Sequence, residues 1–452
     1  MKHYYFIGIG GVSMLGIAQF LLLQGNKVSG SDLKGCEELK DRCKIFDKHD
    51  AKNITNDIDI VVRTSAITPS SAGYVEVEAA TKMKIPVLKR SELIGKMLHN
   101  VVSIGVTGMH GKSTTSSMIA TILHEAKLKP SFLIGANVLN FGKSWNVGES
   151  VIPPFDEKKA KPKYLPDNTV FNKKVRYFVV EACEYDRSFL DIKPKIGVIT
   201  NIDKEHLDYY KGGLPEIKKA FKKFIKNLSE DGLLIVNQDD HNVMSLIKYA
   251  KCKVKRVSIN KPWPGLKLQI PGRHNLLDAT LAAKVAHELG IENKTIKKAL
   301  NNFIGAGRRF EIRGESDSAI VIDDYGHHPT EIRATIQAAK EKYPNKKIIM
   351  VFQPHQYART KILFNDFVKS FDGVDELIIA DTYIIAGREK DIEENLSQKL
   401  AQTIKENGIN AIYISGYDEI CNYLQKNIKK DSIIITQGAT NIFKVGDKYL
   451  NK

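Results

Sequence analysis

Short apolar runs alternate with segments of helical periodicity along almost the whole 452-residue chain. This alternation constrains the fold strongly, because strands that alternate with amphipathic helices usually form parallel sheets with crossover helices. At roughly 150 residues per domain, the length corresponds to about three domains. We therefore predict an α/β protein with three units, each built around its own sheet.

The expected elements fall into three groups along the chain. In the first group we expect a helix over Met14–Leu23 and strands at Tyr4–Ile9, Lys27–Ser29 and Ile58–Val62. In the second we expect a helix over Ser116–Ala126 and strands at Val101–Val106, Tyr177–Val180, Ile196–Ile199 and Leu233–Val236. The third should contain strands at Ile320–Ile322, Lys347–Phe352, Glu376–Ala380, Ile412–Ile414 and Ser432–Thr436. The stretch 146–174, rich in proline and charge, predicts a surface loop or an insertion.

Composition excludes several classes of protein. Apolar residues make up 42% and charged residues 27%, as in ordinary globular proteins. No apolar run approaches the roughly 18 residues that a membrane span needs, and the N-terminus lacks signal-peptide features, so we predict a cytoplasmic protein with no membrane partner. The five cysteines are scattered without a C-x-x-C pair, which indicates free thiols rather than a zinc site or disulfides.

The chain carries a formal net charge of +16. Its lysines are spread over the whole sequence, and no basic motif is interleaved with aromatic residues. Such a charge suits a protein that binds phosphorylated small molecules. We expect no nucleic-acid partner.

The most specific motif is the glycine-rich segment GVTGMHGKST at Gly105–Thr114, between an expected strand and an expected helix. Backbone N–H groups of such a turn bind phosphates, a lysine bridges the terminal phosphates, and a Ser or Thr hydroxyl reaches Mg²⁺. The strict P-loop motif requires glycine at position 106, where Val106 stands. We therefore predict a variant P-loop; the alternative is a glycine turn with an incidental lysine.

A second glycine motif, GIGGVS at Gly8–Ser13, also joins an expected strand to an expected helix. Asp32 follows Gly10 by 22 residues, as the ribose-binding acid does in dinucleotide-binding folds. Ser13 occupies the third glycine position of that fingerprint. The motif indicates a ligand that carries a diphosphate, and tight packing alone is the alternative.

Further polar residues follow expected strands, where parallel sheets place their ligand crevice. Glu181 and His206 come after two strands of the second unit and are candidates for Mg²⁺ ligands. In the third unit, the segments Asp323–Glu331 and Phe352–Thr360 each end a strand and begin a helix. The adjacent His327 and His328 have no i, i+4 partner, so we expect a cluster that orients a substrate rather than a zinc site; purely structural histidines are the alternative.

Taken together and in order, these motifs resemble those of the Mur ligases, most closely the branch that adds L-alanine. The resemblance spans nearly the whole chain. It rests on eight segments: Gly8–Gly11, Ser31-Asp32, Thr107–Lys112, Glu181–Glu184, Glu205–Asp208, Gly272–Asn275, Gly307–Phe310 and Asp324–Glu331.

The resemblance implies an ATP-dependent ligase with three domains. Residues 1–99 would form a Rossmann-like domain for the UDP-sugar, residues 100–308 a central P-loop domain for ATP, and residues 309–452 a Rossmann-like domain for the amino acid. The implied reaction joins L-alanine to UDP-N-acetylmuramate through an acyl phosphate, with ATP and Mg²⁺, as a cytoplasmic step of peptidoglycan precursor synthesis. The protein would be a monomer or a homodimer.

The resemblance also implies the roles of individual residues. Lys112, Glu181, His206, His327 and Arg359 would be catalytic, and Thr114, Glu181 and His206 would bind metal. His327 and Arg359 would hold the amino acid. The nucleotide would contact Gly108, Met109, His110, Gly111, Lys112, Ser113, Thr114, His274, Asn275, Arg309, Asp324 and Tyr325. The UDP-sugar would contact Gly8, Gly10, Gly11, Val12, Ser31, Asp32 and Ser65.

The chain departs from the family pattern at a few positions. Ser13 replaces a glycine, Asp278 stands where asparagine is usual, and Gln356 replaces an arginine three residues before Arg359. Phe221 occupies the position at which some relatives carry a carbamylated lysine. Three other functions compete: a recycling ligase that joins a tripeptide to UDP-N-acetylmuramate, a nicotinamide-dependent oxidoreductase, and a non-catalytic UDP-sugar sensor.

Overall fold

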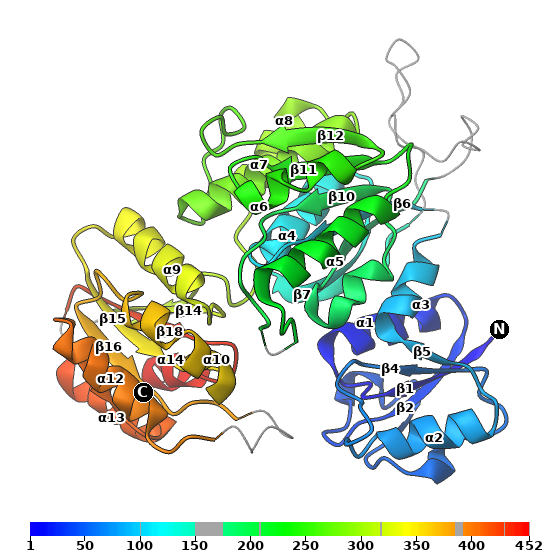
Figure 1. Ribbon diagram of the computed structural model, residues 1–452, viewed down its shortest axis with the longest axis horizontal. Coiled ribbons are helices and arrows are strands. Elements are labelled where there is room, and N and C mark those ends of the chain that lie inside the picture. The colour runs from blue at the N-terminus through cyan, green and yellow to red at the C-terminus, as the bar shows by residue number, and fades with distance from the viewer. Residues whose placement is uncertain are drawn as a thin grey trace. The chain divides into compact units, whose positions relative to one another are not determined.

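The computed structural model describes residues 1–99, 101–149, 175–207, 209–316, 319–384, 392–428 and 430–451. It contains three separate sheets with helices packed against them, which confirms the predicted α/β fold (Figure 1). The chain divides into two compact units. The first unit comprises Met1–Asp203, Leu214–Leu266 and Asp278–Asn301, and the second comprises Lys204–Gly213, Lys267–Leu277 and Asn302–Lys452. The predicted insertion lies outside the described residues from position 150 onward, and the domain boundaries stay predictions.

The first sheet has five parallel strands in the order β3-β2-β1-β4-β5. The strands are β1 (His3–Ile7), β2 (Lys27–Ser31), β3 (Lys44–Phe46), β4 (Ile60–Arg63) and β5 (Val87–Lys89), and the helices are α1 (Val12–Leu23), α2 (Tyr74–Lys82) and α3 (Arg90–Met97). The winding reverses between β1 and β4. Such a reversal opens a crevice at the carboxyl ends of the strands.

The second sheet has seven strands in the order β12-β11-β10-β6-β9-β7-β8, and β8 alone among them runs antiparallel to its neighbour. The strands are β6 (Val102–Thr107), β7 (Ser131–Val138), β8 (Lys143–Asn146), β9 (Tyr177–Glu181), β10 (Ile196–Ile199), β11 (Leu233–Asn237) and β12 (Lys253–Val257). The helices that follow in the chain are α4 (Lys112–Glu125), α5 (Gly213–Asn227), α6 (His241–Met244), α7 (Arg273–Glu288) and α8 (Asn293–Asn301).

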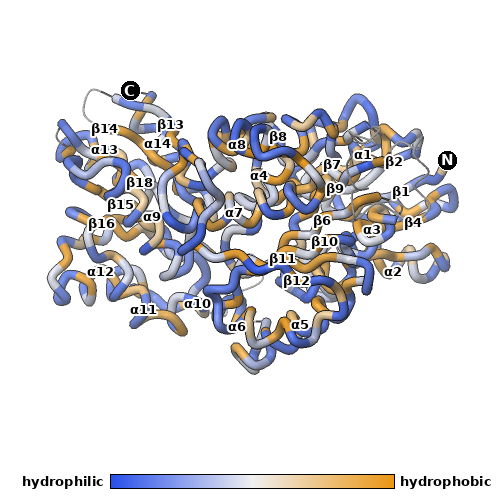
Figure 2. The backbone as a smooth tube through the Cα atoms, turned by 90° about the horizontal axis from the view of Figure 1, so that it is seen from above, coloured by the Kyte–Doolittle hydropathy of each residue, from blue (hydrophilic) through white to orange (hydrophobic). Residues whose placement is uncertain are grey.

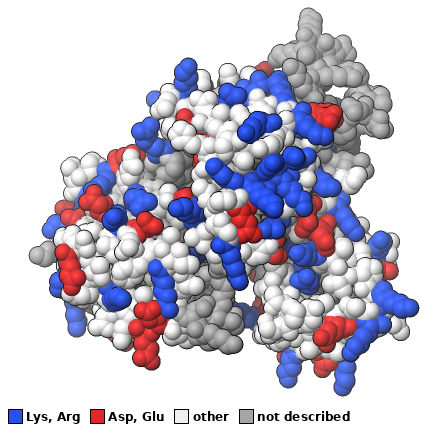
Figure 3. All heavy atoms as spheres, viewed as in Figure 1, with Lys and Arg blue, Asp and Glu red and all other residues white. Residues whose placement is uncertain are grey.

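Burial explains the composition of the central strands. Every residue of β6, β10 and β11 is buried, because helices cover both faces of a parallel sheet. The strands β10 (IGVI) and β11 (LLIVN) are accordingly almost wholly apolar, whereas the buried small residues Ser103 and Gly105 interrupt the apolar residues of β6. Figure 2 gives the hydropathy of each residue along the backbone. The helix α5 is instead amphipathic: Ile217, Phe221 and Phe224 are buried, whereas five lysines lie on its other side. Figure 3 shows basic side chains gathered over this helix.

The helix α3 packs directly against the segment that precedes β10, within the same compact unit. Ser91 Oγ donates to Asp191 Oδ2 at 2.6 Å. A Cβ atom on Gly95 would lie 2.3 Å from the carbonyl oxygen of Asp191. Gly95 therefore permits α3, the last helix of the first sheet, to lie close to the segment that leads into β10 of the second sheet.

The third sheet has six strands in the order β13-β14-β18-β15-β16-β17, with β13 antiparallel to β14. Its strands are β13 (Glu311–Glu315), β14 (Ala319–Asp324), β15 (Lys347–Phe352), β16 (Glu376–Ile379), β17 (Ala411–Tyr413) and β18 (Ser432–Gln437). Its helices are α9 (Pro329–Lys342), α10 (Tyr357–Ile362), α11 (Phe364–Val368), α12 (Leu396–Glu406), α13 (Tyr417–Asn427) and α14 (Phe443–Leu450).

Successive residues of these strands point to opposite faces of the sheet and form two cores. Ile348 and Met350 pack with α9, α11 and α12, whereas Ile349 and Val351 pack with α13 and α14. None of the described helices in either unit is long and apolar enough to cross a membrane.

Candidate active site

The loop between β6 and α4 is held by two residues that follow β10. The backbone N–H groups of Met109 and His110 donate to Asn201 Oδ1 at 3.1 and 2.9 Å. The carbonyl of His110 accepts from Asn201 Nδ2 at 2.9 Å and from Thr200 Oγ1 at 2.6 Å. Sequence reasoning missed the role of Thr200 and Asn201, although their position after a buried strand was an available signal.

Two glycines of this loop have backbone conformations and surroundings that exclude a side chain. Gly108 has φ +138°, and a Cβ atom there would lie 2.0 Å from Thr200 Oγ1. Gly111 has φ +80°, and its Cβ would lie 2.6 Å from Asp278 Oδ1. Asp278 is buried and accepts a hydrogen bond from Thr115 Oγ1 at 3.0 Å. The aspartate, which stands where the family usually has asparagine, therefore packs against Gly111 of the loop and the first turn of α4.

The helix α4 begins immediately after the loop, at Lys112. Its N-cap residue, Gly111, offers no side-chain acceptor to the first turn. Backbone N–H groups at such a helix start are available to an anion. The structure thus brings the seven predicted phosphate-loop residues 108–114 together in the geometry of an anion site.

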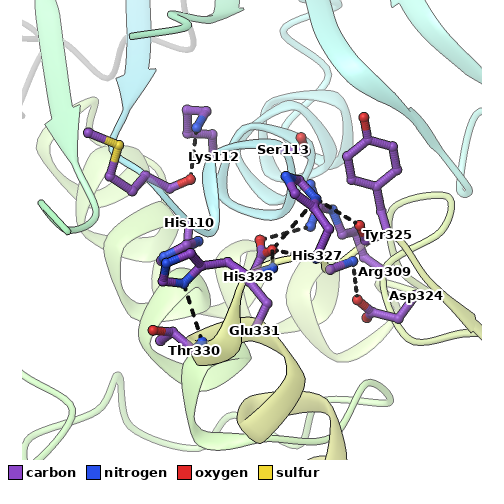
Figure 4. Close-up of polar contacts among 12 residues, drawn as sticks. His110, Lys112, Ser113, Arg309, Asp324, Tyr325, His327, His328, Thr330 and Glu331 are labelled. Atoms are coloured by element: carbon purple, nitrogen blue, oxygen red, sulfur yellow. Dashed lines mark hydrogen bonds and ion pairs between the residues drawn. The ribbon is translucent and has the colours of Figure 1, made fainter. Parts of the chain in front are cut away.

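The Lys112 side chain is folded back onto this loop (Figure 4). Its ammonium donates to the carbonyls of Gly108 at 2.6 Å and Met109 at 3.0 Å, and lies 2.9 Å from Glu184 Oε2. Burial alone would lower the pKa of Lys112, but the nearby anionic groups, Glu184 foremost, raise it to about 12. The lysine is therefore fully charged at neutral pH.

Glu181 ends β9 and pairs with Val106 of β6 in the sheet register. Its Oε2 atom accepts from Ser113 Oγ and from the backbone N–H of Gly135, both at 2.8 Å. The other predicted metal ligand on a strand end, His206, belongs to the second unit and has φ +53°. Glu181 and His206 belong to different compact units, and their pairing as metal ligands stays a prediction.

The predicted UDP-sugar residues lie at the carboxyl ends of three neighbouring strands. Gly8 follows β1, Ser31 ends β2, and Ser65 follows β4. Asp32 accepts from the backbone N–H of Gly10 at 3.0 Å. The helix α1, whose first residue is Val12, starts without a side-chain cap on its N-cap residue Gly11, as expected for an anion-binding turn.

A buried carboxylate that the sequence did not reveal lies behind this edge. Glu76 of α2 is fully buried. It accepts from Tyr5 Oη, Ser31 Oγ and Asn53 Nδ2 at 2.7 to 2.8 Å, and from the His49 ring at 3.1 Å. Ser31 is therefore oriented by a residue on another element. No local motif around Glu76 marks this role.

In the second unit, two adjacent arginines have different environments. Arg308 forms an ion pair with the fully buried Asp323 at 2.7 Å. The guanidinium of Arg309 lies over the Tyr325 ring, 5.1 Å from its centroid, and 3.5 Å from Glu331. Arg309 and Tyr325, both predicted to contact the nucleotide, are thus brought together (Figure 4).

Asp324 lies at the end of β14 and is buried. It accepts from the backbone N–H groups of Phe310 at 2.9 Å and Gly326 at 2.7 Å. Burial is the main reason that the pKa of Asp324 is raised to about 6. The Asp324 carboxylate thus links Phe310, which precedes β13, to Gly326 in the turn that follows β14.

The two adjacent histidines have separate functions in the fold. His328 is the N-cap residue of α9, and its Nδ1 atom accepts from Thr330 N at 3.3 Å. Glu331 closes the capping box by accepting from the N–H groups of His327 and His328. Burial, followed by the positive charge of Arg359, lowers the pKa of His327 to about 4.

Arg359 is buried and faces another predicted motif of the same unit. Its Nη2 donates to Glu205 Oε1 at 2.7 Å, and its Nη1 lies 3.1 Å from His355 Nδ1. Burial would raise the pKa of Glu205, but Arg359 and the surrounding histidines lower it to about 2. Gln356, the departure beside Arg359, is the N-cap residue of α10 with φ +71°.

His274 and Asn275 lie in the first turn of α7, which begins at Arg273. Asn275 is buried, and its Nδ2 donates to the carbonyl of Pro271 at 2.6 Å, whereas His274 is exposed. Their predicted contact with the nucleotide stays a prediction, as do the roles of the other site residues.

A glycine-rich loop between a strand of a mainly parallel sheet and a helix, preceded and followed along the chain by Rossmann-like sheets, is typical of a class of nucleotide-binding α/β proteins. Three family models cover most of the chain: Mur ligase family, catalytic domain (residues 3–101); Mur ligase middle domain (106–274); and Mur ligase, glutamate ligase domain (308–440). The chain belongs to the Mur ligase family.

Among curated relatives, the UDP-N-acetylmuramate–L-alanine ligase of Clostridium botulinum is 38% identical over 480 residues, covering 100% of this chain and 98% of the relative. That of Clostridium acetobutylicum is 39% identical over 481 residues with the same coverage. Among solved structures, the UDP-N-acetylmuramate–alanine ligase of Thermotoga maritima matches with a TM-score of 0.78 at 24% identity, covering 100% of this chain and 99% of that one. A murein peptide ligase from Psychrobacter arcticus matches with a TM-score of 0.70 at 21% identity, covering 100% and 98%.

Proposed function

We propose that this protein joins L-alanine to UDP-N-acetylmuramate, with ATP as the source of energy, in a cytoplasmic step of peptidoglycan precursor synthesis. The observation that carries this proposal is the anion loop of residues 108–114, with Lys112 charged and Glu181 beside it. The names of full-length relatives at 38–39% identity supply the substrates. The protein acts as a monomer or a homodimer, without nucleic acid or membrane partners.

The chemistry requires activation of a carboxylate. A carboxylate is a poor acyl donor, so transfer of the terminal phosphoryl group of ATP to the lactyl carboxylate creates an acyl phosphate with a good leaving group. The amine of L-alanine then attacks the acyl carbon, phosphate leaves, and an amide forms. Positioning and neutralisation of charge provide most of the catalysis in such phosphoryl transfers.

ATP is the nucleotide of this proposal. A Mur ligase of Thermotoga maritima with a TM-score of 0.60 and 15% identity was solved with ADP. The loop N–H groups and Lys112 would hold the phosphates of ATP. Arg309, Asp324 and Tyr325, together with His274 and Asn275, would contact the rest of the nucleotide.

Mg²⁺ is the metal of this proposal. Glu181 Oε2 and Ser113 Oγ lie 2.8 Å apart beside the loop, and carboxylate and hydroxyl oxygens are donors that Mg²⁺ accepts. Thr114 and His206 would complete the protein ligands. When bound, the ion would neutralise phosphate charge during transfer.

The remaining residues would position the two other substrates. The carboxyl edge formed by Gly8, Gly10, Gly11, Val12, Ser31, Asp32 and Ser65 would receive the UDP-sugar. His327 and Arg359 would hold the amino acid. The domains would be residues 1–99, 100–308 and 309–452, in the order UDP-sugar, ATP and amino acid.

The test is release of phosphate from ATP in the presence of UDP-N-acetylmuramate and single amino acids or the tripeptide. We expect release with L-alanine, dependent on both other substrates and on Mg²⁺. Release with the tripeptide alone would assign the recycling reaction, which the curated relatives do not favour. ATP turnover without ligated product would contradict both.

A further inference from the structure

Glu184 is the fully buried partner of the phosphate-loop lysine. Its carboxylate lies 2.9 Å from Lys112 Nζ, and the same ammonium donates to the carbonyls of Gly108 and Met109. An ammonium group has three protons, and these three acceptors use all of them. An incoming phosphate must therefore displace one acceptor or share it.

The backbone around Glu184 fixes the position of this carboxylate. Glu184 precedes the short helix Tyr185–Leu190, in which Asp186 and Arg187 both have φ +54°. The N–H of Arg187 donates to the Glu184 carbonyl at 3.0 Å, and Phe189, which follows in the same turn, is fully buried. The backbone of Glu184 thus belongs to a sharp, packed turn, and its carboxylate is buried against Lys112.

The charges that contact the loop are mostly negative. Glu181 contacts Ser113, Glu184 contacts Lys112, and Asp278 contacts Thr115. The Lys112 ammonium therefore lies beside Glu184, and two further carboxylates, Glu181 and Asp278, contact Ser113 and Thr115 at a site that is proposed to receive a polyphosphate.

We propose that Glu184 is a positioning residue that makes nucleotide binding depend on a divalent cation. Without a cation, a phosphate competes with the buried Glu184 carboxylate for Lys112 and meets the negative charge around the loop. A bound cation supplies positive charge of its own, so the phosphate no longer depends on Lys112 alone. This inference rests on the proposed role of the loop in holding the phosphates of ATP.

The experiment measures the dissociation constant of ATP by titration calorimetry, once with excess Mg²⁺ and once with EDTA, for the full-length protein and its variants. We expect Glu184→Gln to bind metal-free ATP about tenfold or more tightly than the wild type. With Mg²⁺ present we expect a difference of less than about threefold, because the cation already screens the carboxylate. Glu76→Gln is the matched control, since Glu76 is equally buried but belongs to α2 of the first sheet.

Equal affinities of Glu184→Gln and wild type for metal-free ATP would overturn the proposal. Weaker binding by Glu184→Gln in both conditions would also overturn it, because Glu184 would then only hold Lys112 in place. The variant Lys112→Ala tests the proposed function separately. If its affinity for ATP equals that of the wild type, the loop does not bind the phosphates of ATP and the proposed function fails. Thermal unfolding verifies that each variant is folded, and Glu184→Ala replaces Glu184→Gln if the amide does not fold.

Discussion

The pairing of Lys112 with Glu184 makes a residue with a proposed catalytic role part of the packed structure. The Lys112 side chain is 12% exposed and that of Glu184 is fully buried, so each compensates the charge of the other. Removal of one member of a buried ion pair leaves an uncompensated charge and costs about 3–5 kcal/mol. Loss of activity in a single variant at this site therefore mixes chemistry with stability.

We predict that Lys112→Ala lowers both ligase activity and the free energy of unfolding, whereas the double variant Lys112→Ala, Glu184→Gln recovers much of the stability. Activity should fall by about 10²–10³ and should not recover in the double variant, because the phosphates still lack their cation. Denaturant unfolding and steady-state kinetics on the single and double variants measure the two effects. Recovery of activity together with stability would show that Lys112 has only a structural role.

His327 makes stability depend on pH in a definite direction. Its pKa is about 4 in the folded protein and 6.5 ordinarily, so between these values the unfolded chain binds a proton that the folded chain does not. Its contribution to stability is complete above pH 6.5 and is lost as the pH falls toward 4. We predict that the Tm of wild type falls more steeply over this range than that of His327→Gln. The exposed His241 supplies the control variant His241→Gln, whose slope should match wild type.

The sequence revealed residues that end a strand, and it missed residues that act across elements. Lys112 and Glu181 belong to local patterns, a glycine loop and a strand end, and both lie where these patterns predict. Glu76 was missed because its hydrogen-bond partners lie on other elements or loops, up to 71 residues away. Burial of a carboxylate by tertiary contacts leaves no periodic signal in the sequence.

Among the elements, the helix α9 shows most directly how a helix start supports the site. His328 and Glu331 form a capping box, and Glu331 also contacts Arg309. The capping carboxylate therefore links the helix, the histidine pair and a predicted nucleotide-binding arginine. Loss of the Glu331 carboxylate should therefore affect the position of Arg309 as well as the stability of α9.

We predict that Glu331→Ala destabilises the protein by about 0.5–2 kcal/mol, the usual cost of a lost N-terminal cap. Glu341→Ala, at the other end of α9 and on an exposed position, should change the free energy of unfolding by less than about 0.5 kcal/mol. Urea denaturation of both variants measures this difference. Equal effects would mean that the capping box does not stabilise α9.

At the scale of elements, the predicted strands were found within two residues of their expected bounds, because buried parallel strands are rich in apolar residues. Of the edge strands of the three sheets, β17 was predicted and the others were missed. The edge strand β12 reads KVKRV and is half exposed, and the inner strand β7, which was also missed, contains Gly135 and Asn137 where the chain leaves the core. Edge strands lack the two-sided burial that makes a strand recognisable in a sequence.

For the molecule as a whole, part of the net charge of +16 is carried by a single helix. The helix α5 presents five lysines, Lys218, Lys219, Lys222, Lys223 and Lys226, on the same compact unit as the phosphate loop. A charged surface of this kind attracts anionic ligands over distances comparable to the Debye length.

We predict that replacing these five lysines by glutamine slows the association of ATP by about twofold to tenfold at low ionic strength, and has little effect at about 0.5 M salt. The control replaces five exposed lysines of the second unit: Lys340, Lys369, Lys405, Lys426 and Lys444. Stopped-flow measurements with a fluorescent ATP analogue compare the two variants. Equal slowing in both would assign the effect to total charge rather than to α5.

The close approach of Gly95 to Asp191 has a consequence for exchanging domains between relatives. A chimera joined between positions 99 and 100 would set α3 of one parent against the segment before β10 of the other. Any side chain at position 95 would collide with the carbonyl oxygen of Asp191. Loss of Ser91 would leave the Asp191 carboxylate without the hydrogen bond from Ser91 Oγ. Successful chimeras must therefore inherit α3 and the segment around Asp191 from one parent, so the transferable module is larger than the first sheet.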